Sequence, residues 1–266
     1  MRTIAHLSDL HFGRTDPDVV RGACEAVNRM KPDLVVISGD LTQRARSHQF
    51  RAARAFLDRL PKPQIVVPGN HDIPLWNIFA RSFSPLRKYR RIVTRNLEPF
   101  FADGEIAVLG LNTARSLTIK DGRINRRQID VAVARFSAGA PHCVRILVTH
   151  HPFDQPNKGD VGDIVGRAVL AMGAIGSRVD LILSGHLHLG RSGSSTVRYP
   201  GSGALIVLAG TATSTRVRGE PNAFNLLELD GNQLVLRRLE WQATDQTFAE
   251  ATVQRFTRKN GAWSAE

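Results

Sequence analysis

Carboxylate, amide and imidazole side chains recur in this sequence directly after short apolar runs. Five runs end this way, and the residues that follow them are Asp9 and His11, Asp40, Asn70 and His71, His150, and His186 and His188. Oxygen and nitrogen donors without thiolates suit divalent ions such as Mn, Fe, Zn or Co. Eight donors are too many for one ion and enough for two if one carboxylate is shared. Because it follows the middle one of the first three runs, Asp40 is the predicted bridge.

The segment 66–72 concentrates three of these chemistries at one strand end. An apolar run stops at Pro68-Gly69 and is followed by Asn70, His71 and Asp72. Taken alone, the segment is equally consistent with a turn in which Asn70 or Asp72 caps a helix. The four other strand ends favour a reaction centre.

The elements that must hold these residues alternate between strand and helix patterns. Apolar, β-branched runs predict strands at 4–7, 34–37 and 65–67, and helical spacing of apolar residues predicts helices over 17–30 and 47–60. This order predicts a largely parallel sheet whose strand ends share one edge, where ligands bind in α/β proteins. The later runs predict strands at 107–111, 144–148, 181–183, 205–209, 224–229, 234–241 and 247–256, helices within 122–136 and 165–175, and a Gly/Ser loop at 192–195 and 200–203.

No linker or change in composition divides the 266 residues. We therefore predict an α/β fold of two sheets packed face to face, in a single domain over 1–266 with the donor blocks within 3–212. The strands over 213–266 either complete the second sheet or pair across a homodimer.

The segment 74–96 interrupts the alternation and allows two interpretations. Its aromatic residues fall near one helical face, and its basic residues are Arg87, Lys88, Arg90, Arg91 and Arg95. One interpretation is a lid that offers aromatic rings and cations to a substrate. The other is a surface helix whose aromatic residues reach the core and whose charges are solvated.

A net charge of +12 and an isoelectric point near 10.9 favour anionic partners. Arginine dominates, since only six of the 36 basic residues are lysine, and either phosphate binding or genomic coding preference accounts for that bias. A nucleic acid is not the favoured partner, because no binding module or long basic tail is present. A membrane surface contacted peripherally is a further anionic candidate.

Other parts of the sequence bear on its location in the cell. No apolar run is long enough for a membrane span, and polar residues follow Met1 too early for a signal peptide. We therefore expect a cytoplasmic protein. Cys24 and Cys143 lack metal-ligand spacing and are expected to be inert, buried thiols.

The donor blocks together resemble the signature of the calcineurin-like metallophosphoesterase superfamily, nearest to the bacterial class III cyclic-nucleotide phosphodiesterase group. The blocks that carry the resemblance are Asp9-x-His11, Gly39-Asp40, Gly69-Asn70-His71-Asp72, His150 followed by Pro152, and Gly185-His186-x-His188. The resemblance implies a four-layer α-β-β-α sandwich of two mixed sheets flanked by helices.

The same resemblance implies roles for individual residues. One ion would be held by Asp9, His11 and His188, the other by Asn70, His150 and His186, with Asp40 between them. His71 would act on the leaving-group oxygen, and Asp72 would orient His71. His151 is an alternative to His150, and the position two residues before Pro152 selects His150.

These observations predict a binuclear metal-dependent phosphohydrolase, preferring diesters, in which a hydroxide held between the ions attacks phosphorus in line. Mn or Fe is the expected metal, with Zn or Co as alternatives, and an anionic phosphate ester is the expected substrate. A cyclic nucleotide is the first choice. The alternatives are a phospholipid or lipid-A-precursor (pyro)phosphohydrolase, a nuclease, and a catalytically silent scaffold.

Overall fold

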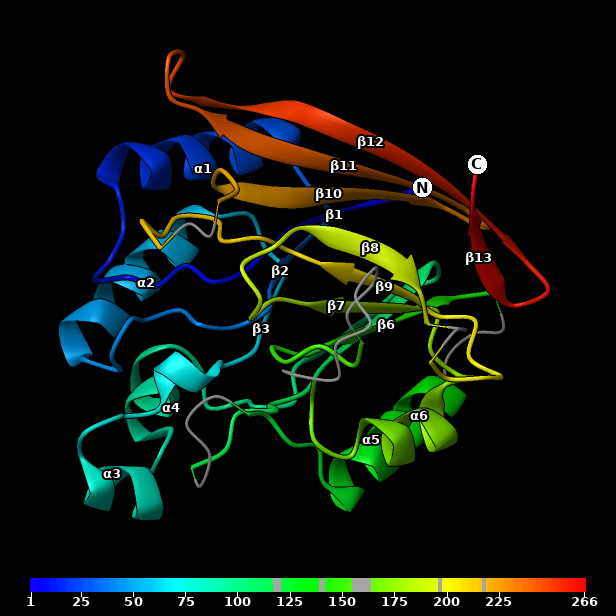
Figure 1. Cartoon of the computed structure of the whole chain (residues 1–266), viewed down its shortest axis with the longest axis horizontal. Coiled ribbons are helices and arrows are strands. Elements are labelled where there is room, and N and C mark those ends of the chain that lie inside the picture. The colour runs from blue at the N-terminus through cyan, green and yellow to red at the C-terminus, as the bar shows by residue number, and fades with distance from the viewer. Residues whose placement is uncertain (117–120, 139–141, 155–163, 196–197, 217–218) are drawn as a thin grey trace.

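The computed structural model describes residues 1–116, 121–138, 142–154, 164–195, 198–216 and 219–266. Two mixed β-sheets pack face to face, and helices cover their outer faces (Figure 1). Apolar side chains fill three layers: one between the sheets and one under each set of helices. This is the predicted α-β-β-α arrangement.

The first sheet joins both ends of the chain. Its strand order is β13-β12-β11-β10-β1-β2-β3. Strands β1, β2 and β3 are parallel, whereas β10 to β13 are antiparallel. The bounds are β1 Arg2–Leu7, β2 Leu34–Ile37, β3 Gln64–Val66, β10 Ala223–Asp230, β11 Gln233–Gln242, β12 Thr247–Lys259 and β13 Ala262–Ala265.

The prediction that the C-terminal strands complete the second sheet is wrong. Strand β1 pairs with β2 along one edge, and the backbone groups of its other edge need partners. Strand β10 supplies them, with Ile4 opposite Leu227. The C-terminal strands therefore extend the first sheet, and β13 is an additional strand that the sequence pattern did not indicate.

The second sheet has the order β4-β5-β6-β7-β9-β8. Strands β5, β6, β7 and β9 are parallel, and the edge strands β4 and β8 are antiparallel to their neighbours. The segment 191–194, which overlaps the predicted Gly/Ser loop at 192–195, is the edge strand β8. The bounds are β4 Phe100–Ala102, β5 Ile106–Gly110, β6 Val144–Val148, β7 Leu181–Ser184, β8 Arg191–Ser194 and β9 Leu205–Leu208.

Two helices cover each sheet: α1 (Pro17–Met30) and α2 (Ser47–Arg59) cover the first, and α5 (Arg126–Ser137) and α6 (Ala168–Ile175) cover the second (Figure 1). Local sequence sets the limits of α1. The Asp16 side chain accepts hydrogen bonds from the first turn, and the helix ends at Lys31 with φ 47°, just before Pro32. Among the described residues, no helix has the length and apolar character needed to cross a membrane.

The segment 74–96 forms two short helices, α3 (Ile78–Phe83) and α4 (Arg87–Ile92). Trp76, Phe79 and Phe83 are each at least 80% exposed, so the expectation that these aromatic residues reach the core is wrong. Instead, Tyr89 packs inward, and its hydroxyl donates to the Val66 carbonyl at 3.0 Å.

Candidate metal centre

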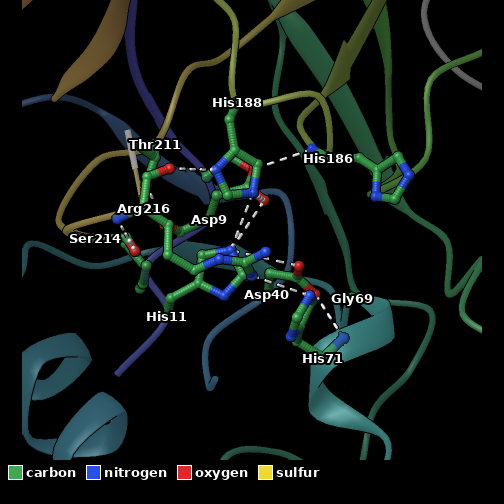
Figure 2. Close-up of polar contacts among 12 residues, drawn as sticks. Asp9, His11, Asp40, Gly69, His71, His186, His188, Thr211, Ser214 and Arg216 are labelled. Atoms are coloured by element: carbon green, nitrogen blue, oxygen red, sulfur yellow. Dashed lines mark hydrogen bonds and ion pairs between the residues drawn. The ribbon is translucent and has the colours of Figure 1, made fainter. Parts of the chain in front are cut away.

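The ends of five parallel strands meet at one edge of the sandwich. Strands β1, β2 and β3 of the first sheet and β6 and β7 of the second lead into loops that carry all the predicted donors. Figure 2 shows His188, His11 and Asp9 gathered together, with Asp40 between His11 and the Gly69–His71 turn. Residues far apart in sequence thus converge as predicted.

Asp9, His11 and His188 form the first donor cluster. The Asp9 Oδ1 atom lies 3.5 Å from His11 Nε2 and 3.3 Å from His188 Nε2, and the two Nε2 atoms are 3.2 Å apart. Ligand atoms that bind one ion at about 2.0–2.2 Å in tetrahedral directions lie about 3.4 Å apart. The triangle therefore has the dimensions of a metal site.

The two carboxylate oxygens of Asp9 have different surroundings. Its Oδ2 accepts hydrogen bonds from Ser8 Oγ at 2.7 Å and from the His186 backbone N–H at 2.9 Å. Its Oδ1 is buried and has no hydrogen-bond partner among the described residues. A buried oxygen without a donor is costly unless a cation faces it. The protein thus fixes one oxygen of Asp9 and leaves the other as a candidate metal ligand.

Asp40 lies between the first donor cluster and a second. Its Oδ2 is 3.6 Å from His11 Nε2, and its Oδ1 is 3.4 Å from His150 Nε2. The His71 backbone N–H donates to Oδ1 at 2.9 Å and holds the carboxylate in this orientation. Each oxygen faces a different cluster, which is the arrangement that a bridging ligand needs.

The second cluster contains Asn70, His150 and His186. His150 Nε2 is 3.1 Å from Asn70 Oδ1, and the rings of His150 and His186 have centroids 5.1 Å apart. The His151 ring also lies near His186, at 4.6 Å, but its Nδ1 contacts Thr113 Oγ1 at 2.9 Å. Donor atoms of His150, His151 and His186 lie within 4.8 Å of one another. The choice of His150 over His151 stays a prediction.

Backbone carbonyls set the tautomers of two imidazoles. A carbonyl only accepts, so His150 Nδ1 donates to Ser38 O at 2.8 Å and His188 Nδ1 donates to Arg216 O at 3.1 Å. In each neutral ring the lone pair is then on Nε2, which faces the cluster. Such supporting bonds orient ligand histidines in metal sites.

The buried Asp40 carboxylate and the imidazoles around it shift one another's pKa values. Burial acts to raise the pKa of Asp40, but the charges of His150 and His71 outweigh it and hold this pKa well below the usual range. Burial acts to lower the pKa of His150, but Asp40 outweighs it and raises this pKa to about 9. A metal ligand histidine must be neutral, so a bound cation would replace this proton.

Five of the predicted ligands have a left-handed backbone. Their φ angles are 52° for Asp9, 49° for His11, 52° for Asp40, 74° for His186 and 61° for His188. Each such non-glycine residue costs on the order of 1–3 kcal/mol and persists only where the surrounding structure enforces it. The loops thus store strain at the residues that converge on the centre.

The glycines of the donor blocks permit close approach between loops. A Cβ on Gly69 would collide with the Oδ1 atom and the backbone nitrogen of Asp40, and a Cβ on Gly39 would lie 2.5 Å from His150 Nδ1. Larger residues at these two positions would displace the Asp40 carboxylate or the His150 imidazole.

The predicted role of Asp72 in orienting His71 is wrong. The Asp72 carboxylate accepts hydrogen bonds from the backbone N–H groups of Leu41, Thr42 and Gly69 and from the Thr42 hydroxyl. Burial and the charge of Asp40 raise its pKa to about 6. Because Asp72 ties the loop after β2 to the loop after β3, it is a positioning residue for Asp40 and Asn70.

The His71 ring is oriented instead by Gln43 and Arg216. Its Nδ1 donates to the Gln43 carbonyl at 3.0 Å, and its Nε2 lies 3.2 Å from Arg216 Nη1 (Figure 2). Sequence reasoning missed Arg216, because no motif distinguishes it from the other arginines of this basic chain. Its loop follows β9, a further parallel strand ending at the same edge, and that position is the signal that could have found it.

Comparisons with known proteins identify the family. The calcineurin-like phosphoesterase family model matches residues 2–190, so the chain belongs to that family, as the donor blocks indicated. It is therefore a metallophosphoesterase, a hydrolase of phosphoric esters, and the family uses divalent metals.

Two curated proteins are similar in sequence. A probable cyclic nucleotide phosphodiesterase of Synechococcus sp. is 26% identical over 91% of this chain and 93% of its own length. The glycerophosphodiester phosphodiesterase GpdQ of Enterobacter lignolyticus is 35% identical over 80 residues, which are 26% of this chain and 29% of its own length.

Solved structures share the fold at low sequence identity. A purple acid phosphatase from yellow lupin superimposes with a TM-score of 0.71 at 12% identity, over 95% of this chain and 53% of its own. Vps29 of Chaetomium thermophilum gives a TM-score of 0.51 at 15% identity, over 97% and 98% of the two chains. At these identities the likeness shows the fold alone.

The substitution Gly69→Ala tests the close approach of Gly69 to the Asp40 carboxylate. We expect the added Cβ to displace Asp40, lower the bound metal and reduce kcat by about 100-fold, the order of loss that a displacement near 1 Å produces. Gly173→Ala in α6 is the matched control, since a Cβ there meets nothing within 4 Å. Metal analysis and turnover measure the effect, and a Gly69→Ala protein with normal metal content and kcat would contradict this account.

Proposed function

We propose that this chain is a binuclear-metal phosphodiesterase. Asp9, His11 and His188 would hold one ion, Asn70, His150 and His186 the other, and Asp40 would bridge them. The observation that carries the proposal is the Asp40 carboxylate, whose two oxygens face His11 and His150 at 3.6 and 3.4 Å. Two donor clusters that share one carboxylate suit two ions better than one.

Manganese or iron is the proposed metal, with zinc or cobalt as alternatives that accept the same donors. Bound in pairs, such ions neutralise phosphoryl oxygens and make a water molecule nucleophilic at neutral pH. The chain's own contribution is to fix the donors: supporting bonds to Ser38 and Arg216 hold the imidazoles, and His71 N–H holds Asp40.

We assign the leaving-group step to His71. Its Nδ1–H donates to the Gln43 carbonyl, so Nε2 is the ring atom left for proton transfer, and Nε2 accepts a hydrogen bond from Arg216 Nη1 at 3.2 Å. To protonate the departing alkoxide, Nε2 would first take up a proton while Arg216 Nη1 turns from it to that oxygen, whose developing negative charge the guanidinium would stabilise. A sugar alkoxide is a poor leaving group and benefits from both.

The substrate is proposed from the similar proteins and from the charge of the chain. Both curated relatives bear phosphodiesterase names, and one of them is a probable cyclic nucleotide phosphodiesterase. A cyclic nucleotide is therefore the first choice, followed by a phospholipid or lipid-A-precursor ester and by a nucleic acid. Cytoplasmic location, peripheral membrane contact and homodimer formation stay predictions.

Hydrolysis of bis(p-nitrophenyl) phosphate tests the proposed reaction. The purified protein loaded with Mn²⁺ should release p-nitrophenol, a chelator should abolish the release, and added Mn²⁺ should restore it. A fully metal-loaded protein that leaves every phosphodiester intact would overturn the proposal.

Two neighbouring substitutions separate metal binding from proton transfer. Asn70→Ala should lower the occupancy of one metal site. His71→Ala should keep both ions and lose about 10²–10⁴ in kcat, the usual contribution of a general acid. Metal analysis with turnover measures both, and loss of metal from His71→Ala would show that its assigned role is wrong.

A substrate panel tests the choice of a cyclic nucleotide. We expect the largest kcat/KM for cyclic AMP among cyclic AMP, single-stranded DNA, a glycerophosphodiester and a nucleotide-linked lipid. The highest kcat/KM on any of the other three would replace the cyclic nucleotide as substrate while leaving the phosphodiesterase proposal in place.

A further inference from the structure

A cavity of about 570 Å³ lies between α4 and the loop after β5. Five arginines line it: Arg87, Arg90, Arg91, Arg95 and Arg115. Ile73, Leu86 and Leu97 add apolar wall. We call this cavity the arginine pocket.

The arginine pocket concentrates positive charge without a compensating carboxylate. Among the described residues, its lining contains no Asp or Glu, and the guanidinium groups of Arg87, Arg90, Arg91 and Arg95 form no ion pair or hydrogen bond. Glu98, the acidic residue nearest to them in sequence, binds Arg127 at 2.6 Å instead. These four arginines are exposed, so water screens part of their mutual repulsion, and an anion bound among them would relieve the rest.

Arg115 is a half-buried arginine in the wall of the pocket. Its guanidinium donates to the carbonyls of Asn112 and Ala114 and to the Gln128 side chain. Burial lowers the pKa of Arg115, and the charge of Arg123 adds to this effect. Arginine stays protonated at neutral pH, so Arg115 adds a fixed positive charge to the lining of the pocket.

Hydrogen bonds hold the walls of the pocket in place. Lys88 donates to the Ala45 carbonyl at 3.0 Å, and Arg54 donates to the Val93 carbonyl at 3.0 Å, so α4 is fastened on both sides of Tyr89. Arg81 of α3 donates to the Ser116 carbonyl at 2.6 Å and joins α3 to the loop after β5. Because the walls are already held in place, a ligand can bind without the entropic cost of ordering them.

Two parts of the arginine pocket's wall are directly continuous in sequence with segments of the metal centre. Ile73 directly follows the Asn70–Asp72 turn. Asn112 and Ala114 flank Thr113, whose hydroxyl contacts His151 at 2.9 Å. A substrate with its scissile phosphorus at the metal centre could therefore extend toward the arginines.

We propose that the arginine pocket binds a phosphate group other than the one that is hydrolysed. Guanidinium groups bind phosphate oxygens in pairs, and several around one cavity suit a multiply charged group. The role of the pocket as a substrate subsite rests on the proposed phosphodiesterase function. Its ability to bind a phosphate anion does not depend on that function.

Calorimetric titration of the Mn²⁺-loaded protein with inorganic phosphate tests the anion site. We expect two binding events per chain, one at the metal centre and one at the arginine pocket. In Arg90→Gln/Arg95→Gln the second event should weaken at least tenfold, while the metal content and the unfolding midpoint stay at the wild-type values.

The matched control is Arg29→Gln/Arg126→Gln, which removes the same charge from exposed positions on α1 and α5 outside the pocket. It should keep both events. A single event in the wild type, or an unchanged second event in Arg90→Gln/Arg95→Gln, would overturn the proposal.

A substrate pair distinguishes a phosphate carried by the substrate from a free one. Thymidine 5′-(p-nitrophenyl phosphate), with and without a 3′-phosphate, differs only in a phosphate that does not react. A gain of at least tenfold in kcat/KM from the 3′-phosphate, lost in Arg90→Gln/Arg95→Gln, supports a substrate subsite. Equal kcat/KM values with two phosphate-binding events support a site for free phosphate and overturn the substrate role.

Failure of the proposed function gives a different result. If the metal-loaded wild type releases p-nitrophenol from neither thymidine ester nor from bis(p-nitrophenyl) phosphate, the phosphodiesterase proposal fails. The phosphate titration still decides whether the arginine pocket binds an anion.

Discussion

The buried carboxylates of Asp9 and Asp40 are the constraint on which the site depends. Isolated negative charges in a protein interior are costly, so each must face compensating groups. Part of the compensation comes from the protein, through the Ser8 hydroxyl and the backbone N–H groups of His186 and His71. The other carboxylate oxygens of Asp9 and Asp40 lie near imidazole nitrogens at the spacing of metal ligands. Bound cations would therefore complete the compensation of the two negative charges.

The fold supplies the rigidity that this arrangement needs. Parallel strands from both sheets end at one edge, and backbone hydrogen bonds join their loops: Asp9 N–H donates to Gly39 O, and His11 N–H donates to Asp40 O. Asp72 adds a second connection between the loops after β2 and β3. Five donor residues have left-handed backbone, a strained conformation that persists only where the surrounding structure holds it in place.

The sequence predicted the parts of this protein that depend on local pattern. The strand runs and the helix over 17–30 are visible in apolar spacing, and each of the five donor blocks follows its own strand end. Which strands pair is a non-local property, so the sequence did not show that the C-terminal strands would join β1. Periodicity also does not say whether an apolar face is covered, and Phe79 and Phe83 are exposed.

The roles of residues that depend on the direction of their side chains could likewise not be predicted from the sequence. Asp72 stands beside His71 in the chain, yet the N–H groups that its carboxylate meets belong to other loops. Arg216 reaches His71 from a loop 145 residues away, and nothing in its sequence neighbourhood marks it. Both assignments needed the convergence of loops that only the fold provides.

Electron paramagnetic resonance of the Mn²⁺-loaded protein tests the central claim most directly, because two ions that share a carboxylate are magnetically coupled. The account predicts two Mn²⁺ per chain with a coupled spectrum, and a change to the spectrum of isolated ions in Asp40→Ala. One ion per chain, or two ions with an isolated-ion spectrum in the wild type, would contradict it.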